Sequence, residues 1–180
     1  MIYIFLANGF EEVEALATVD VLRRADLKVK IVGVGSDVIT GAHGISTVCD
    51  AVDSDLTPGD DIEAVILPGG MPGTLNLERS AKVNGFVDYA YENKKLVCAI
   101  CAAPSILGHK GMLKGKKAVC FPGFESELEG AELSDSFVVT DGNIITAKGM
   151  GSAVKFGIAI GAAFVGEAKM KKIEESLQCS

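Results

Sequence analysis

This sequence has few histidines and no long basic or apolar run. Its 180 residues include two histidines, and 17 basic residues stand against 24 acidic ones, which gives a formal net charge of −7. The basic stretches Lys114–Lys117 and Lys169–Lys172 are too short to follow a phosphate backbone, so we expect no tight binding of nucleic acid. The most apolar late segment, Ala153–Gly166, is too short to cross a bilayer and contains Lys155, so it predicts a buried helix and no membrane partner.

The sequence also lacks a secretory signal and an even number of cysteines. No basic region precedes the first apolar run, as would be typical of a signal peptide. Five cysteines cannot all pair within one chain, which favours free thiols in a reducing compartment. We therefore expect a cytoplasmic protein. A chain of this length, with 48% hydrophobic residues, is expected to form one domain over residues 1–180.

Short apolar runs alternate with segments of helical periodicity along the chain. The predicted strands are Ile2–Ala7, Val29–Val34, Ile45–Cys49, Ala64–Leu67, Leu96–Ile100 and Ala118–Phe121, followed by a hairpin of Phe137–Thr140 and Asn143–Ala147. The predicted helices are Phe10–Ala25, Ser80–Asn93, Ser152–Val165 and Glu167–Leu177, and Met71–Leu77 is expected to be a loop with a short helical turn. This alternation predicts an α/β fold with a mostly parallel central sheet between two layers of helices. Ligands of such sheets bind beyond the carboxyl ends of the strands.

The stretch from Leu96 to Pro104 predicts a reactive cysteine. Cys101 directly follows the apolar run Leu96–Ile100, and Pro104 suits the first turn of a helix. Cys101 would then lie on a sharp turn between a strand and a helix, as in a nucleophile elbow. The partial positive charge of the helix end is expected to lower the pKa of the Cys101 thiol. The alternative is a buried structural cysteine, which is the commoner state of a free thiol.

Three other uses of Cys101 are poorly supported. Cys98 and Cys101 have a Cys-x-x-Cys spacing, but on an extended strand their Cα atoms would be about 10 Å apart, beyond the range of a disulfide. A zinc site would need a second pair of ligands, which has no match in the sequence. A cysteine–histidine hydrolase would need His109, about two helical turns away, or His43, which lies in a turn-rich segment.

Glu14 and three backbone positions are the other candidates for a site around Cys101. Glu14 is near the start of the first helix, where a buried, protonated carboxyl group would donate a hydrogen bond to a thiolate. The alternative is that Glu14 and the two preceding glutamates only favour the helix N-terminus on a solvated face. Gly69 and Gly70 follow a strand and allow the backbone to approach a substrate closely. The N–H groups of Gly70 and Ala102 are candidates for binding an oxyanion.

Three separated motifs resemble the ThiJ/PfpI superfamily, in its DJ-one branch. They are GFEEVEAL at residues 9–16, VILPGG at residues 65–70 and AICAAP at residues 99–104. The predicted hairpin and the following TAKGMGSAVKFGIAI resemble the last strand and the long helix of that branch. The likeness covers nearly the whole chain in matching order and spacing, so it is much more specific than any single motif.

The resemblance implies a flavodoxin-like three-layer sandwich of the class I glutamine amidotransferase-like type, assembled as a homodimer. It implies that Cys101 is the reactive cysteine, that Glu14 is its protonated partner, and that Gly70 and Ala102 supply the N–H groups that stabilise an oxyanion. It also implies three activities. These are a glyoxalase for a small 2-oxoaldehyde such as methylglyoxal, without cofactor or metal, a deglycase for glycated protein, and a sensor of oxidation through Cys101.

The sequence departs from the superfamily pattern at two positions. Phe121 stands where some members have a histidine near the cysteine, and Ala102 stands where protease-like members have a histidine directly after it. Both departures weaken a peptidase interpretation and leave Glu14 as the candidate for moving protons. Turnover of a 2-oxoaldehyde and sensing of oxidation remain two open hypotheses, and both are centred on Cys101.

Overall fold

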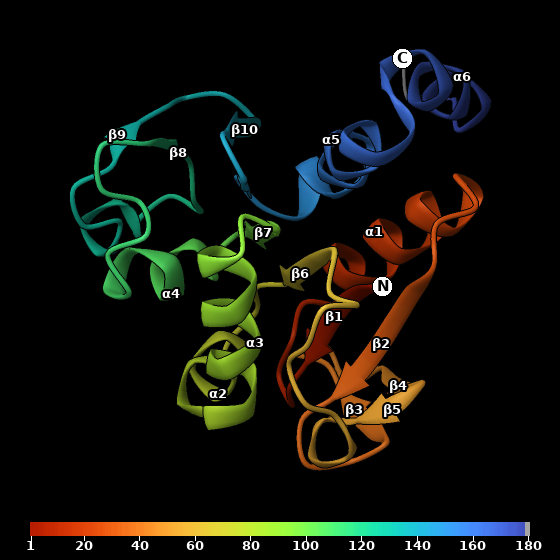
Figure 1. The fold of residues 1–180 in the computed structure, drawn as a ribbon, viewed down its shortest axis with the longest axis vertical. Coiled ribbons are helices and arrows are strands. Elements are labelled where there is room, and N and C mark those ends of the chain that lie inside the picture. The colour runs from red at the N-terminus through yellow and green to blue at the C-terminus, as the bar shows by residue number, and fades with distance from the viewer. Residues whose placement is uncertain (179–180) are drawn as a thin grey trace.

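A seven-stranded sheet forms the centre of the computed structural model, which describes residues 1–178 (Figure 1). The strand order is β10-β11-β7-β6-β1-β2-β5. The strands are β1 (Ile2–Leu6), β2 (Val29–Gly33), β5 (Ala51–Val52), β6 (Ala64–Leu67), β7 (Leu96–Ile100), β10 (Val138–Asp141) and β11 (Ile144–Ala147). All neighbours are parallel except β10, which runs antiparallel to β11 in the expected hairpin. The predicted α/β class and the mostly parallel sheet are confirmed.

Alternate residues of the central strands enter two separate cores, because side chains of a strand point to opposite faces. In β1, Ile4 belongs to one core and Phe5 to the other. The helices α1 (Glu12–Arg24) and α5 (Ala153–Val165) cover the Ile4 face. The opposite face is covered by α2 (Gly73–Arg79), α3 (Ala81–Glu92) and α4 (Pro104–His109), as Figure 1 shows. The structure is thus the three-layer sandwich that the sequence predicts.

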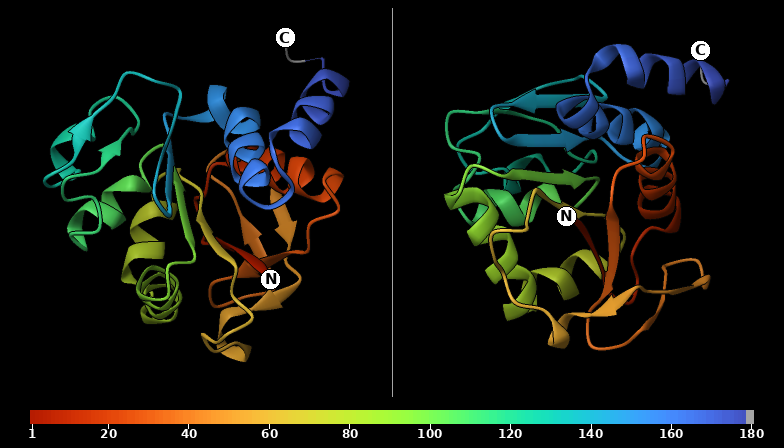
Figure 2. Two further views of the ribbon diagram at one scale, coloured as in Figure 1. Left: turned by 45° about the horizontal axis from the view of Figure 1, so that its top comes forward. Right: turned by 45° about the vertical axis from the view of Figure 1, so that its right-hand side comes forward.

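The last helix, α6 (Glu167–Ser176), lies outside these layers. Its Met170 is fully buried and packs with Val21 and Ala25 of α1. Figure 2 shows α6 running on from α5 along the outside of the molecule. No helix within residues 1–178 is long and apolar enough to cross a membrane.

Residues 73–79 form a helix where the sequence suggested a loop with one helical turn. Two contacts with other elements explain the difference. Leu77 is fully buried in the core beneath α3, and the Asn76 side chain donates to the carbonyl of Asn8 at 2.9 Å. Tertiary packing therefore stabilises a helix that the local sequence, with its prolines and glycines, does not favour.

The strand predicted for Ala118–Phe121 is wrong in extent and in position. Only β8 (Lys117–Ala118) is a strand, and it pairs with β9 (Glu132–Leu133) outside the main sheet. The next backbone groups bond elsewhere: Val119 N donates to Thr146 Oγ1 at 3.0 Å. A small hairpin, β3 (Val38–Thr40) with β4 (Ser46–Val48), and three 3₁₀ turns, η1 (Asp53–Asp55), η2 (Glu125–Glu127) and η3 (Met150–Ser152), complete the fold.

Candidate active site

Four loops meet at the carboxyl edge of the sheet. The parallel register of β1, β6, β7 and β11 places the loops after these strands at the same edge. They lead to Glu14 in the first turn of α1, to Gly69, to Cys101 and to Gly149. The convergence of the first three was expected from the order of strands and helices. Gly149 was not expected at the site, although the Gly149-Met150-Gly151 break between a strand and a helix is a signal at the same edge of the sheet.

Cys101 lies on a sharp turn between β7 and α4, with a positive φ of 66°. For a residue with a side chain this backbone conformation costs roughly 1–3 kcal/mol. Two hydrogen bonds hold it in place. The Cys101 N–H donates to the carbonyl of Ala147 at 2.9 Å, and the Cys101 carbonyl accepts from the N–H of Phe121 at 2.8 Å. The strained turn lifts the thiol out of the sheet, as the expected elbow requires.

Backbone N–H groups approach the Cys101 sulfur from two loops. The N–H groups of Gly70 and Ala102 both form hydrogen bonds to it. Gly69 provides the space for this arrangement, since a Cβ on Gly69 would lie 2.5 Å from Cys101 Cβ and 2.8 Å from Glu14 Oε2. Any side chain at residue 69 would therefore displace one of the two groups that the turn brings together.

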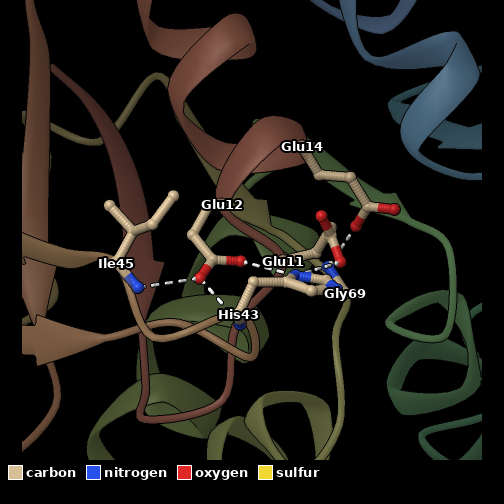
Figure 3. A network of polar contacts seen from close by, with 6 residues as sticks. All are labelled: Glu11, Glu12, Glu14, His43, Ile45 and Gly69. Carbon is tan, nitrogen blue, oxygen red and sulfur yellow. Dashed lines mark hydrogen bonds and ion pairs between the residues drawn. The ribbon is translucent and has the colours of Figure 1, made fainter.

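Glu14 is 1% exposed, although it lies in the first turn of an outer helix. Its Oε2 accepts the N–H of Gly69 at 2.9 Å, and its carboxyl group is hydrogen-bonded to the thiol of Cys101 (Figure 3 shows the bond to Gly69). Its Oε1 is buried and has no hydrogen-bond partner in the part of the chain that the structure describes. The alternative of a solvated carboxylate is thus excluded for Glu14.

The pKa values of the Glu14 carboxyl group and of the Cys101 thiol are both raised. Burial raises the pKa of the Glu14 carboxyl to about 7, against hydrogen bonds from Cys101 and Gly69 that lower it. Burial, and then the negative charge of Glu14, raise the pKa of the Cys101 thiol to about 12, against the opposing N–H groups of Gly70 and Ala102. Beside an ionised Glu14, the expected lowering of the thiol pKa is therefore wrong. Helix α4 has only six residues, and its dipole does not outweigh burial and a neighbouring carboxylate.

A thiolate at Cys101 therefore depends on where the shared proton lies. Two adjacent negative charges in a buried site repel each other strongly, so a thiolate requires Glu14 to keep its proton. In that state the repulsion is gone, and the N–H groups of Gly70 and Ala102 favour the charged sulfur. The protonated carboxyl group then acts as a hydrogen-bond donor to the sulfur.

The other described cysteines, Cys49, Cys98 and Cys120, are also free thiols, and each has a raised pKa. Burial raises the pKa of Cys49 and of Cys120 to about 11, and it raises that of Cys98, which is fully enclosed in the core between the sheet and α1, still more. Cys98 and Cys101 form no disulfide. Cys179 lies outside the described residues.

His43 is bound to the start of α1. Its Nδ1 lies 3.0 Å from Glu12 Oε2, and the backbone N–H groups of His43 and Ile45 donate to Glu12 Oε1 at 2.8 and 3.3 Å (Figure 3). Although burial opposes it, these hydrogen bonds keep the pKa of Glu12 below its usual value. The same contact with Glu12 raises the pKa of His43. Glu12 thus fastens the turn around residue 43 to α1.

His109 is held between two carboxylates. Its Nδ1 lies 2.5 Å from Glu78 Oε1 and its Nε2 lies 2.8 Å from Glu127 Oε2, which ties the end of α4 to α2 and η2. The hydrogen bonds to Glu78 and Glu127 raise the pKa of His109. With both ring nitrogens engaged, His109 is unsuited to take a proton from Cys101, so neither histidine supports a cysteine–histidine hydrolase.

An apolar cavity of about 310 Å³ opens beside the Glu14 carboxyl group. It is lined by Phe121, Pro122, Phe137, Lys148, Gly149, Met150, Gly151 and Ser152. Gly149 connects the two features, because a Cβ on Gly149 would lie 3.1 Å from the Phe121 ring and 4.0 Å from Glu14 Oε1.

Comparison with known proteins gives a consistent result over the whole chain. The model of the DJ-1/PfpI family matches residues 1–163. Protein dj-1beta of Drosophila melanogaster is 31% identical over 177 residues, which cover 97% of this chain and 94% of that protein. A crystal structure of a mutant DJ-1 superfamily protein from Salmonella typhimurium is 33% identical, with a TM-score of 0.91 over 98% of this chain and 97% of that one. The structure of oxidized Toxoplasma gondii DJ-1 superposes with a TM-score of 0.93 at 27% identity, over 98% and 97% of the two chains.

Proposed function

Because the chain belongs to the DJ-1/PfpI family, we propose that it is a glyoxalase or deglycase that acts on methylglyoxal, or on its protein adducts, through Cys101. The observation that carries the proposal is the hydrogen-bonded pair of Glu14 and Cys101, with the N–H groups of Gly70 and Ala102 directed at the sulfur. DJ-1 family proteins are commonly homodimers, and we propose a homodimer here too. The free thiols at Cys49, Cys98, Cys101 and Cys120 fit a protein that works in the cytoplasm.

The first step is addition of the Cys101 thiolate to the aldehyde carbon. The sulfur–carbon bond forms as the carbonyl electron pair moves onto oxygen, and the N–H groups of Gly70 and Ala102 face this developing oxyanion. The proton of Glu14 then moves to the oxygen and gives a hemithioacetal. Glu14 is left as a carboxylate. It is not repelled by the sulfur, because the thiolate has formed a neutral bond to carbon.

The second step uses Glu14 as a base. Its carboxylate removes the proton from the former aldehyde carbon, which gives an enediolate, and returns a proton to the adjacent carbon. The hydroxyl proton of the hemithioacetal moves to the former ketone oxygen, and the product is a lactoyl thioester on Cys101. One carbon is oxidised and its neighbour reduced, so no external oxidant is needed. Water then attacks the thioester, lactate leaves, and the Cys101 thiolate is restored with the proton back on Glu14. The overall reaction converts one methylglyoxal and one water into lactic acid.

Lactate formation in heavy water tests this sequence of steps. We expect the protein alone, without glutathione, to convert methylglyoxal into lactate, with deuterium at carbon 2 because Glu14 exchanges its proton with solvent between removal and return. Proton and deuterium NMR of the product measure both results. Absence of lactate would overturn the proposed function, and lactate that retains only hydrogen at carbon 2 would overturn the proton transfer through Glu14.

Oxidation sensing at the same sulfur is a second candidate. The pair of N–H donors and the protonated Glu14 that favour a thiolate would equally hold a sulfinate, formed as one thiolate and two hydrogen peroxide molecules give a sulfinate and two waters. Burial disfavours the thiolate of Cys98, and no backbone N–H donors offset that effect as they do at Cys101.

Mass spectrometry after mild treatment with peroxide tests this candidate. We expect two added oxygen atoms on Cys101, located by fragmentation of the peptide that holds both Cys98 and Cys101, and none on Cys49, Cys98 or Cys120. Equal oxidation of all the cysteine peptides would contradict a sensor built around Cys101. Turnover of methylglyoxal by the untreated protein separates this role from the enzymatic one.

A further inference from the structure

Three exposed apolar side chains surround the cavity beside Glu14. The exposed fractions are 47% for Phe121, 58% for Phe137 and 54% for Met150. They come from three separate segments, the loop after β8, the residue before β10 and the turn η3, so the fold gathers them at one place. Large apolar side chains clustered at the mouth of a cavity are typical of a binding site.

The cavity is connected to the reacting groups through short contacts. Phe121 donates its backbone N–H to the carbonyl of Cys101 at 2.8 Å, so the loop after β8 lies directly against the turn that holds Cys101. Gly149 lies between the Phe121 ring and the buried Glu14 Oε1, so its lack of a side chain brings the cavity close to the carboxyl group. The unpartnered, buried Glu14 Oε1 lies on this side.

The cavity wall is mainly apolar. Among the described residues that line the cavity, Lys148 alone carries a charged side chain. A volume of about 310 Å³ is at the lower end of the range of roughly 300–1,000 Å³ that holds small molecules. A phenyl ring covers more of this apolar wall than a methyl group does.

We propose that this cavity binds the substituent of the substrate, and that the preferred substrate of the Cys101 site is a 2-oxoaldehyde bearing an aromatic or similarly large apolar group. The inference rests on the proposed function, because it names the substrate class of the same site. The aldehyde carbon bonds to Cys101, its oxygen faces the N–H groups of Gly70 and Ala102, and the substituent lies between Phe121 and Phe137. Apolar contacts of this size typically change kcat/KM by about 10- to 200-fold.

Kinetics with two aldehydes test the preference. We expect kcat/KM for phenylglyoxal to exceed that for methylglyoxal by at least about tenfold. Phe137→Ala should reduce this ratio about fivefold or more, because it removes one wall of the cavity. Val48→Ala is the matched control, since Val48 is an exposed apolar residue on β4, outside the cavity, and the ratio should not change. A ratio near one in the wild type would overturn the preference.

Alkylation of Cys101 separates failure of this inference from failure of the proposed function. Iodoacetamide and its N-phenyl analogue are compared by the rate at which they modify Cys101, each normalised to its rate with N-acetylcysteine. We expect the phenyl reagent to react at least about fivefold faster with the wild type, and Phe137→Ala to lose the advantage. If neither aldehyde yields a hydroxy acid but this advantage holds, the glyoxalase falls and the aromatic cavity stands. If the phenyl reagent has no advantage, the inference is wrong whatever the turnover.

Discussion

Replacing Cys101 with serine is expected to lower kcat/KM for lactate formation from methylglyoxal by at least about 1,000-fold. The serine hydroxyl fits the space of the thiol and keeps the contacts of the turn. It does not ionise near neutral pH, and a Glu14 that holds its own proton cannot activate it. NMR of the product and circular dichroism of the variant measure the loss of activity and the retention of the fold.

The control for Cys101→Ser is the same substitution at a second cysteine. Cys49→Ser changes a half-buried cysteine on a different loop, and we expect it to keep the wild-type rate. If Cys101→Ser kept more than a tenth of that rate while Cys49→Ser was unchanged, the nucleophile would have to be sought elsewhere. Background lactate formed without protein is subtracted in both cases.

Replacing Glu14 with glutamine is expected to have opposite effects on activity and on stability. Glutamine keeps the acceptor for the Gly69 N–H and adds an N–H donor toward Cys101, but it cannot relay protons. We expect kcat for lactate formation to fall at least about 100-fold. The same variant should react faster with iodoacetamide at Cys101 near pH 7, because burial still raises the thiol pKa but the negative charge that raises it further is gone.

The gain in stability follows from the raised pKa of Glu14. The folded protein holds this proton up to about pH 7, whereas the unfolded chain releases it near pH 4.5. Folded protein thus binds more protons between these values, and its stability falls as the pH rises through them. At about 1.4 kcal/mol per pKa unit, the ionised carboxylate costs about 3 kcal/mol above pH 7. Glu14→Gln should remove that cost and raise Tm by several degrees at pH 8, with little change at pH 4.

Thermal unfolding at several pH values checks this expectation. The matched control is Glu132→Gln on the exposed strand β9, which should leave both Tm and its pH dependence unchanged. A Glu14→Gln variant that was less stable than the wild type at pH 8 would contradict the account of a buried, reluctantly ionised carboxyl group. A gain in stability joined to a loss of turnover would show that the site is kept at a thermodynamic cost.

The central layers could be predicted from sequence because their signals are local. Apolar runs such as Ile2–Leu6 and Leu96–Ile100 and the helical periodicity of α1 and α3 each reflect a face that must be buried. The failures are places where distant contacts decide. The backbone N–H of Val119 donates to the Thr146 hydroxyl and does not join the main sheet. Helix α2 forms because Leu77 is buried in the core.

Part of the candidate site could be predicted from the sequence for the same reason. The turn at Cys101 and the glycines 69 and 70 have local signatures, so their convergence followed from the order of strands and helices. The burial of Glu14 and the raised pKa of the Cys101 thiol did not, because both depend on how closely α1 packs against the loop after β6. The cavity beside Gly149 was missed altogether, since its walls come from segments that are separate in the sequence.

The ends of the sheet bear on how copies of this chain can associate. One outer strand, β5, has two residues, and the other, β10, has four. Such short edge strands expose few unpaired backbone N–H and C=O groups, so they are poor templates for pairing with the sheet of another subunit. A pair of subunits would instead have to meet through helices and loops, and it would gain its affinity from side chains rather than from a continuous ladder of main-chain bonds.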